Sequence, residues 1–331
     1  MASYEKLLQP LQVAGLRLKN RMLSAPTSMA ELGPGEHYSD DNINYYKLKA
    51  AGGVALVSVG DVIVDLSTGR SHPMQVGLDD PTAVPYLVKM ADAIHSGGAA
   101  AEIEIDHGGA LCDPVFIGGK NAIGPSGYVD DWGDEVKEMT EEQIYEIADK
   151  FAEAAATAKA CGFDMVMIHA GHGWLLHQFI SEITNHRTDK WGGSLENRMR
   201  FIMDVCRAVK KACGKDFLIS TNITVPEAQE GGWTLEDAIE ACKMLEGLAD
   251  IVGVYGDEID PRHVTQFEPK MPYAEACAAI RAGIADRPNR VIIETMGGYT
   301  DPDDMESVIA EGKADLISMA RAFIADPQFG K

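Results

Sequence analysis

The stretch GFDMVMIHAGHGW, residues 162–174, shows the pattern that decides the fold. Its first residue, Gly162, follows a long amphipathic segment at the position where a helix C-cap is expected. Four apolar residues, Met165–Ile168, come next, and polar residues begin at His169. A continuous apolar run of this length is typical of a parallel strand that is covered on both faces. The stretch therefore predicts a helix end, a buried strand and a polar loop, in that order.

The same unit recurs along the whole chain. Segments with helical periodicity separate the apolar runs, and two of them open with capping patterns at Thr140 and Thr234. This alternation predicts a (β/α)8 TIM barrel, a parallel eight-stranded barrel formed by residues 1–331 as a single domain. An open doubly wound sheet is the alternative, disfavoured because no GxGxxG follows the first strand. The predicted strands are Met22–Ala25, Val54–Val59, Ala101–Ile105, Met165–Ile168, Phe217–Thr221, Ile251–Val254, Val291–Glu294 and Leu316–Met319. The predicted helices are Asn42–Ala51, Val84–Ser96, Glu141–Cys161, Leu195–Cys213, Leu235–Leu245, Tyr273–Ala285 and Asp303–Glu311.

The last unit is short. Only RAFIADPQFGK comes after Ala320, and it is too short for a full helix over strands eight and one. We therefore expect the eighth helix to be short or truncated. Either the natural polypeptide continues beyond Lys331, which we favour, or a partner covers this surface.

Composition excludes several classes of partner. The formal charge of −22 and the pI near 4.7 disfavour nucleic acid and anionic membranes. Neither a signal peptide nor an apolar stretch of transmembrane length is visible. The six cysteines form no CxxC pair, so the sequence indicates neither a zinc knuckle nor an iron–sulfur ligand run, and a reducing cytoplasm fits best.

Polar residues and glycines follow the predicted strands, where a barrel of this type forms its active site. In the run ETMGGYTDPDDM, Gly297 and Gly298 would let backbone amides approach a phosphate, and Arg321, one strand later, would supply a bidentate cation. We predict a phosphate site there; a tight turn and a surface ion pair are the alternative. The complete set of strand-end candidates is Ser28, Gly60, Glu104, His107, His169, His172, Asn222, Gly297, Gly298 and Arg321.

Two histidines stand out in this set. His169 and His172 are three residues apart, directly after an apolar strand. They could bind a metal, hold a carbonyl oxygen or act as acid and base. Because the spacing forces no third ligand, we predict no metal site.

The surrounding sequence resembles a known family. The stretch GHGWLLHQFISEITNHRTDKWGGSLENRMRF, residues 171–201, resembles the signature of the old yellow enzyme family, and in particular its long members such as 2,4-dienoyl-CoA reductase, 2-enoate reductase and trimethylamine dehydrogenase. The opening LLQPLQVAGLRLKNRMLSAPTSM and the closing DLISMARAFIADPQF look like the first and last strand segments of that family. The resemblance implies an FMN-binding barrel that transfers hydride from the flavin to an activated alkene, with NADH or NADPH as the electron source. It also implies that an iron–sulfur cluster and FAD would belong to a further C-terminal part.

The resemblance assigns roles to individual residues. It places Pro26, Thr27 and Ser28 near flavin N5 and O4, Gly60 under the isoalloxazine, His169 and His172 at the substrate carbonyl oxygen, and Gly297, Gly298, Ala320 and Arg321 at the phosphate. It also implies that Arg187, Asp189, Glu196 and Arg198 brace the signature loop by ion pairs, with His177 and His186 structural or at the surface.

Three positions depart from the family pattern. Glu104 replaces a glutamine at the flavin pyrimidine edge, where it can still accept from N3–H. Asn222 replaces an arginine near N1 and O2, which predicts a lower flavin midpoint potential than in typical relatives. Trp174 replaces the tyrosine that donates a proton, so the donor is another group or water, and Trp174 is expected to be an aromatic wall for a planar substrate.

The leading function is therefore reduction of a carbonyl-conjugated alkene. An amine or demethylating flavin dehydrogenase is a second interpretation, and a catalytically weakened flavin-binding homologue is a third; two histidines favour a carbonyl substrate. The sequence leaves the oligomeric state open, including a homo-oligomer. Five aromatic residues in the strand-end loops predict a flat, apolar small-molecule substrate: Phe116, Tyr128, Trp132, Tyr255 and Phe267.

Overall fold

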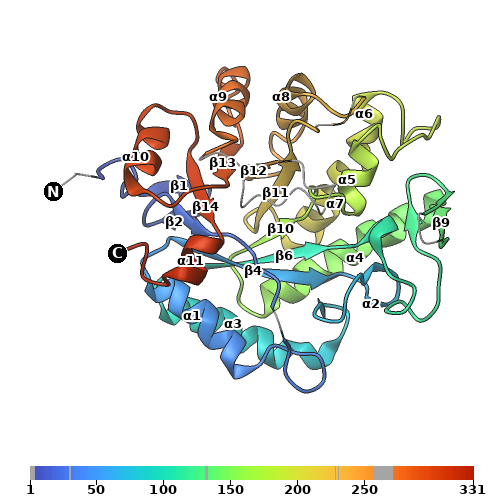
Figure 1. Ribbon diagram of the computed structural model, residues 1–331, viewed down its shortest axis with the longest axis horizontal. Helices are drawn as coiled ribbons and strands as arrows, with labels where there is room; N and C mark the ends of the chain where they lie inside the picture. Colours follow the sequence, from blue (N-terminus) through green and yellow to red (C-terminus); the bar gives the residue numbers. More distant parts are fainter. Residues whose placement is uncertain (1–3, 30, 131–132, 228, 230, 257–270) are drawn as a thin grey trace.

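The chain folds as a closed (β/α)8 barrel in the computed structural model, which describes residues 4–29, 31–130, 133–227, 229, 231–256 and 271–331 (Figure 1). Eight parallel strands pair in one ring, and the pairing of the first with the second closes it. They are β3 (Met22–Ser24), β4 (Leu56–Ile63), β6 (Ala100–Asp106), β10 (Met165–Ile168), β11 (Leu218–Thr224), β12 (Ile251–Tyr255), β13 (Ile292–Met296) and β14 (Leu316–Met319). All eight predicted strands are confirmed.

Amphipathic helices surround the ring (Figure 1). Thr140 and Thr234 form the predicted capping boxes with Gln143 and Asp237. Met199 divides one predicted helix into two. The helices between strands are α1 (Asp40–Ala51), α3 (Val84–Ser96), α4 (Glu141–Ala160), α6 (Leu195–Arg198), α7 (Arg200–Cys213), α8 (Leu235–Met244), α9 (Ala274–Gly283) and α10 (Pro302–Ala310). Among the described residues, no helix has both the length and the apolar character needed to cross a membrane.

A hairpin closes the N-terminal end of the barrel. Strands β1 (Leu11–Val13) and β2 (Leu16–Leu18) pair antiparallel, and Val13 and Leu18 are buried against an apolar layer inside the ring. That layer consists of Leu23, Leu56, Met165, Leu218, Ile251 and Leu316. Because one end is closed by apolar side chains, a polar site can form only at the opposite end.

The last helix is short, as expected. Helix α11 (Arg321–Ala325) has five residues, and its Phe323 is fully buried. The chain after it lies against the turn that follows α1: a Cβ on Gly52 would come within 1.6 Å of the Pro327 carbonyl oxygen. The closing segment and α1 lie side by side in Figure 1.

A small excursion follows β6 at the C-terminal end of the barrel. It contains β7 (Ile123–Gly124), β8 (Tyr128–Val129) and β9 (Glu135–Glu138), which form a three-stranded sheet. Ser126 accepts a hydrogen bond from the His186 backbone N–H, which ties this excursion to the loop after α5 (Leu175–Ile180). The excursion therefore forms part of the wall of the active-site end.

Candidate functional site

A polar cavity of about 180 Å³ lies at the C-terminal ends of the barrel strands. Four strands, the second, third, sixth and seventh of the ring, and the loops after the first and the fourth supply its wall. Its lining residues are Pro26, Ser28, Asp61, Glu104, Asp106, His169, His172, Trp174, Tyr255 and Met296. The structure thus brings together both predicted histidines, Trp174 and Glu104.

His169 is held by a strand neighbour. The side-chain amide of Asn222 accepts from the backbone N–H of Ala170 through Oδ1 at 2.7 Å, and its Nδ2 lies 2.6 Å from His169 Nδ1. Asn222 is fully buried and does not line the cavity. It therefore acts on the site through His169, a role that its position in the sequence did not suggest.

His172 lies in a strained loop that several groups support. Its φ is 53°, and its backbone N–H donates to Thr224 Oγ1 at 3.1 Å. Its ring stacks on Tyr255 with centroids 5.3 Å apart and an angle of 6° between the planes. Buried His177 accepts from the next backbone N–H, that of Gly173, and approaches Glu227 at 3.3 Å. The bracing of this loop is structural, as expected for His177.

Burial determines the protonation of the two histidines. It lowers the pKa of His169 to about 4 and that of His172 to about 3. Both rings are therefore neutral at pH 7. A neutral imidazole still offers one N–H donor, which can polarise a carbonyl oxygen.

Three carboxyl groups share the cavity with the histidines. Burial and the neighbouring charge of Asp61 raise the pKa of Glu104 and of Asp106 well above the usual range. The raised pKa favours the protonated form of Glu104, which can donate as well as accept, whereas the sequence suggested a carboxylate. Within the part of the chain that the structure describes, no lysine or arginine lines this cavity.

The segment expected under the flavin ring is tightly arranged. A Cβ on Gly60 would lie 2.7 Å from both Glu104 Oε2 and Pro26 Cβ. Tyr46 donates its hydroxyl to the carbonyl oxygens of Thr27 and Gly60. Any side chain at residue 60 would therefore displace its neighbours, and the close approach suits the face of a planar ring system.

The predicted phosphate residues also converge. Gly297 and Gly298 follow β13 with φ of 114° and 71°, and Ala320 and Arg321 follow β14, the adjacent paired strand. Glycine adopts positive φ without steric cost, so the turn can present its backbone amides to an anion. The donor set fits the phosphate of FMN.

The comparisons with known proteins agree with this geometry. A model of the NADH:flavin oxidoreductase / NADH oxidase family matches residues 6–331. The chain belongs to this family. That membership places it among the FMN-dependent NAD(P)H oxidoreductases and confirms FMN as the cofactor.

Individual relatives cover the chain almost completely. The NADH oxidase of Thermoanaerobacter brockii is 33% identical over 332 residues, which is 100% of this chain and 51% of that protein. The cinnamate reductase of Clostridium sporogenes is 31% identical, over 98% of this chain and 52% of that protein. A structure of 2-naphthoyl-CoA reductase with 2-naphthoyl-CoA superposes with a TM-score of 0.90 at 29% identity, covering 99% of this chain and 52% of that one. The chain therefore spans about half the length of these relatives.

Four cavity residues went unnoticed as site residues in the sequence: Asp61, Asp106, Tyr255 and Met296, although Tyr255 was among the expected aromatic residues. The signal for Asp106 was present, because alternate residues of a strand share a face and Glu104 lies two positions earlier.

Two other candidates lie apart from the cavity lining. His107 Nδ1 accepts a hydrogen bond from Gly109 N–H, and its Nε2 lies 3.1 Å from Thr68 Oγ1, so its role is structural. Phe116 lines neither this cavity nor the apolar cavity that shares His172 with it. Trp132 and Phe267 lie outside the described residues.

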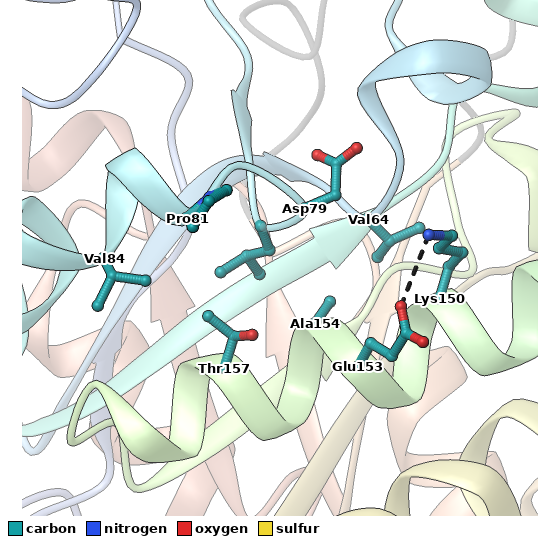
Figure 2. Close-up of a pocket in the computed structure, with 9 residues that line it drawn as sticks. Val64, Asp79, Pro81, Val84, Lys150, Glu153, Ala154 and Thr157 are labelled. Atoms are coloured by element: carbon teal, nitrogen blue, oxygen red, sulfur yellow. Dashed lines mark ion pairs between the residues drawn. The ribbon is translucent and has the colours of Figure 1, made fainter.

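A second cavity, of about 300 Å³, lies outside the barrel between α4 and the chain after β4 (Figure 2). Lys150 and Glu153 pair there at 3.6 Å, and Asp79 is the third charged residue of its lining. None of the candidate site residues lines it. Among the described residues, no group of three or more His, Cys, Asp or Glu side chains is arranged to hold a metal ion.

Proposed function

We propose that residues 1–331 form the single FMN-binding barrel domain of an ene-reductase. FMN, when bound, would supply hydride for the β-carbon of an alkene conjugated with a carbonyl, and NADH or NADPH would supply the electrons. The observation that carries this proposal is the pair of neutral histidines, His169 and His172, in one cavity with the residues expected to hold the flavin.

The chain offers two grips for the cofactor. Pro26, Thr27, Ser28 and Gly60 would hold the isoalloxazine, with the neutral acid Glu104 at its polar edge. The phosphate would be held by the backbone at Gly297 and Gly298 with Ala320 and Arg321, on the two adjacent strand ends.

The hydrogen bonds of Asn222 favour one protonated nitrogen of His169. Asn222 Oδ1 accepts from Ala170 N–H, and both amide atoms lie near His169 Nδ1, Nδ2 at 2.6 Å and Oδ1 at 2.9 Å. We propose that Nδ2, the closer atom, donates to that ring nitrogen, which leaves the proton on Nε2. His169 Nε2–H can therefore donate to the substrate carbonyl oxygen.

His172 supplies the second donor. Two donors directed at one oxygen stabilise the enolate that forms as hydride arrives, and such stabilisation is worth about 10²–10³-fold in rate for each donor. Its stacking on Tyr255 fixes the ring, so the donor is in place before the substrate binds.

A third, mainly apolar cavity of about 150 Å³ supports a substrate class, because it shares His172 with the polar cavity at the strand ends. Ala110, Leu111, Pro125 and Tyr128 contribute to its wall. A planar substrate could place its carbonyl at the histidines and its apolar part here, with Trp174 as a wall. The names of two relatives support this choice, because cinnamate and naphthoyl-CoA each join an aromatic ring system to a carbonyl.

The proposal is tested with the FMN-loaded chain. After reduction by dithionite, trans-cinnamaldehyde and 2-cyclohexenone should reoxidise the flavin, and saturated cyclohexanone should not. His169→Ala and His172→Ala should each slow the reaction about 10²-fold or more while FMN stays bound. If no enone reoxidises the flavin, the proposed reaction is wrong.

A further inference from the structure

The proposed reaction needs a proton donor in addition to His169 and His172, which donate to the carbonyl oxygen. Hydride addition at the β-carbon leaves an enolate, which must take a proton at its α-carbon. Trp174 stands where the family resemblance places a tyrosine, and an indole N–H is too weak an acid for this step. The donor is therefore water or another group that reaches the same cavity, and the cavity lining contains such a group.

Asp106 has the required position. It ends β6, is 1% exposed and lines the cavity with both histidines. Its Oδ1 is buried and has no hydrogen-bond partner among the described residues. A buried carboxyl oxygen that accepts no hydrogen bond penalises the charged form, which favours the protonated acid at Asp106.

Asp61, on the neighbouring strand β4, forms a hydrogen bond with Asp106. Two carboxyl groups can form such a bond only when one of them carries a proton. Gln75 Nε2 donates to both oxygens of Asp61, at 3.2 and 3.1 Å, and Ser28 Oγ donates to Oδ2 at 3.1 Å. These donors stabilise the charged form of Asp61, so the shared proton belongs to Asp106.

Asp61 also connects the pair to solvent. His72 Nε2 lies 2.9 Å from Asp61 Oδ2, and the His72 side chain is 36% exposed while that of Asp61 is 8% exposed. A continuous chain of proton-carrying groups therefore runs from the surface at His72, through Asp61, to Asp106 in the cavity.

The other titratable groups around the pair agree with this distribution of charge. Burial raises the pKa of Glu104 on β6 and of Tyr38 in the loop before α1, which favours the neutral form of both side chains. Neither group therefore stabilises a second negative charge beside Asp61, and Glu104 raises the pKa of Asp106 further. Burial raises the pKa of Cys112, and the nearby Asp106 raises it further, so Cys112 stays a thiol. For Asp61, burial favours the acid, but hydrogen bonds from His72 and Asp106 outweigh it and lower its pKa.

We propose that Asp106 is the acid that protonates the substrate α-carbon, and that Asp61 and His72 return the proton from solvent. The Asp106 O–H bond breaks as the enolate electron pair forms the new C–H bond, which leaves Asp106 as a carboxylate. A proton from solvent then passes through His72 and Asp61 to Asp106, so no oxidant or reductant takes part. This inference rests on the proposed ene-reductase function.

The test separates hydride transfer from protonation by using β-nitrostyrene. Hydride addition to a nitroalkene gives a nitronate anion, which water protonates slowly at carbon and which is visible by its own absorbance. In the parent protein, the saturated nitroalkane should form without nitronate accumulation. In Asp106→Asn, flavin reoxidation should continue, but nitronate should accumulate, with its protonation slowed about 10²-fold or more.

His72→Gln tests the return path. Its first turnover should match that of the parent, later turnovers should be slower, and added imidazole should restore them, which a merely structural role would not explain. His95→Gln is the matched control, because His95 also pairs with an aspartate, Asp164 at 2.8 Å, with a side chain 40% exposed. It should behave as the parent.

Two outcomes are decisive and distinct. Protonation of the nitronate at the parent rate in Asp106→Asn, with flavin reoxidation and FMN content unchanged, would overturn the role of Asp106 and leave the proposed function intact. Failure of the parent itself to reoxidise with β-nitrostyrene, trans-cinnamaldehyde and 2-cyclohexenone would remove the proposed function and this inference together.

Discussion

Replacement of Asn222 by alanine tests the mechanism at one residue that touches neither substrate nor cavity. The variant removes the acceptor for Ala170 N–H and the donor that fixes His169 Nδ1. Each of the two buried groups left without its partner costs about 1–3 kcal/mol, so the free energy of unfolding should fall by about 2–6 kcal/mol.

The activity loss should exceed what this destabilisation explains. Without the amide, the proton of His169 is no longer confined to Nε2, and one of the two oxygen donors is lost for part of the population. Loss of such a donor costs about 10²-fold in rate, so flavin reoxidation by trans-cinnamaldehyde should slow by about that factor at saturating substrate. Nitrogen-15 NMR of histidine-labelled protein measures the tautomer directly, with the His169 signal assigned from the His169→Ala variant.

Thr221→Ala is the matched control. Thr221 lies next to Asn222 on β11, is 1% exposed and donates one hydrogen bond to Ile168 O at 2.9 Å. It should lose stability of the same order and keep the parent tautomer and rate. A parent-like rate and tautomer in Asn222→Ala, or an equal loss of rate in Thr221→Ala, would refute the proposed role of Asn222.

Three further predictions concern charge. Because its raised pKa favours the neutral form of Glu104, Glu104→Gln should change the flavin midpoint potential by less than about 30 mV. Asp61→Asn, which removes a charge from the same cavity, should raise the potential by more, and equal shifts in a redox titration would contradict the assignment. Arg321→Ala should weaken FMN binding about tenfold or more and leave riboflavin binding unchanged in fluorescence titrations, since only FMN carries the phosphate. Burial lowers the pKa of Lys49 from 10.5 to about 7, so the unfolded chain binds more protons between these values and the folded protein becomes more stable as the pH rises. Lys49→Met should therefore raise the free energy of unfolding at pH 7, on the order of 2 kcal/mol once the lost contact of Lys49 with the Tyr45 ring is subtracted. Urea titrations should show this gain shrinking toward pH 10. A gain that grows with pH would contradict the prediction.

The sequence was sufficient to predict the barrel because hydrophobic periodicity is a local property. Strand β10 has the predicted bounds to the residue. Strands β4 and β11 continue past their predicted ends, through Asp61 and Asn222 respectively. Polar residues that face the interior at the active-site end interrupt the apolar pattern without ending the strand, so the missing residues were those of the site itself.

The site was only partly predictable, for a different reason. His169 and His172 could be recognised because they follow a strand directly, and barrel strands end at the active site. The link between Asp61 and Asp106 depends on the pairing of two strands that lie about forty residues apart, with Ile63 opposite Asp106. No local pattern encodes that register, and a carboxylate at a strand end is usually a surface residue.

The departures from the family pattern act together. An arginine in place of Asn222 would introduce a cation next to His169, whose Nδ1 lies 3.5 Å from Glu104 Oε1, and a nearby cation favours the ionised form of a carboxyl group. With asparagine there, no such cation opposes the protonated form of Glu104, and we propose Asp106 as the proton donor in place of Trp174. The same exchange removes a positive charge from the flavin environment, so a midpoint potential below that of typical relatives remains our prediction. A flavin that is harder to reduce is a stronger hydride donor, which suits an alkene activated only by neutral hydrogen-bond donors.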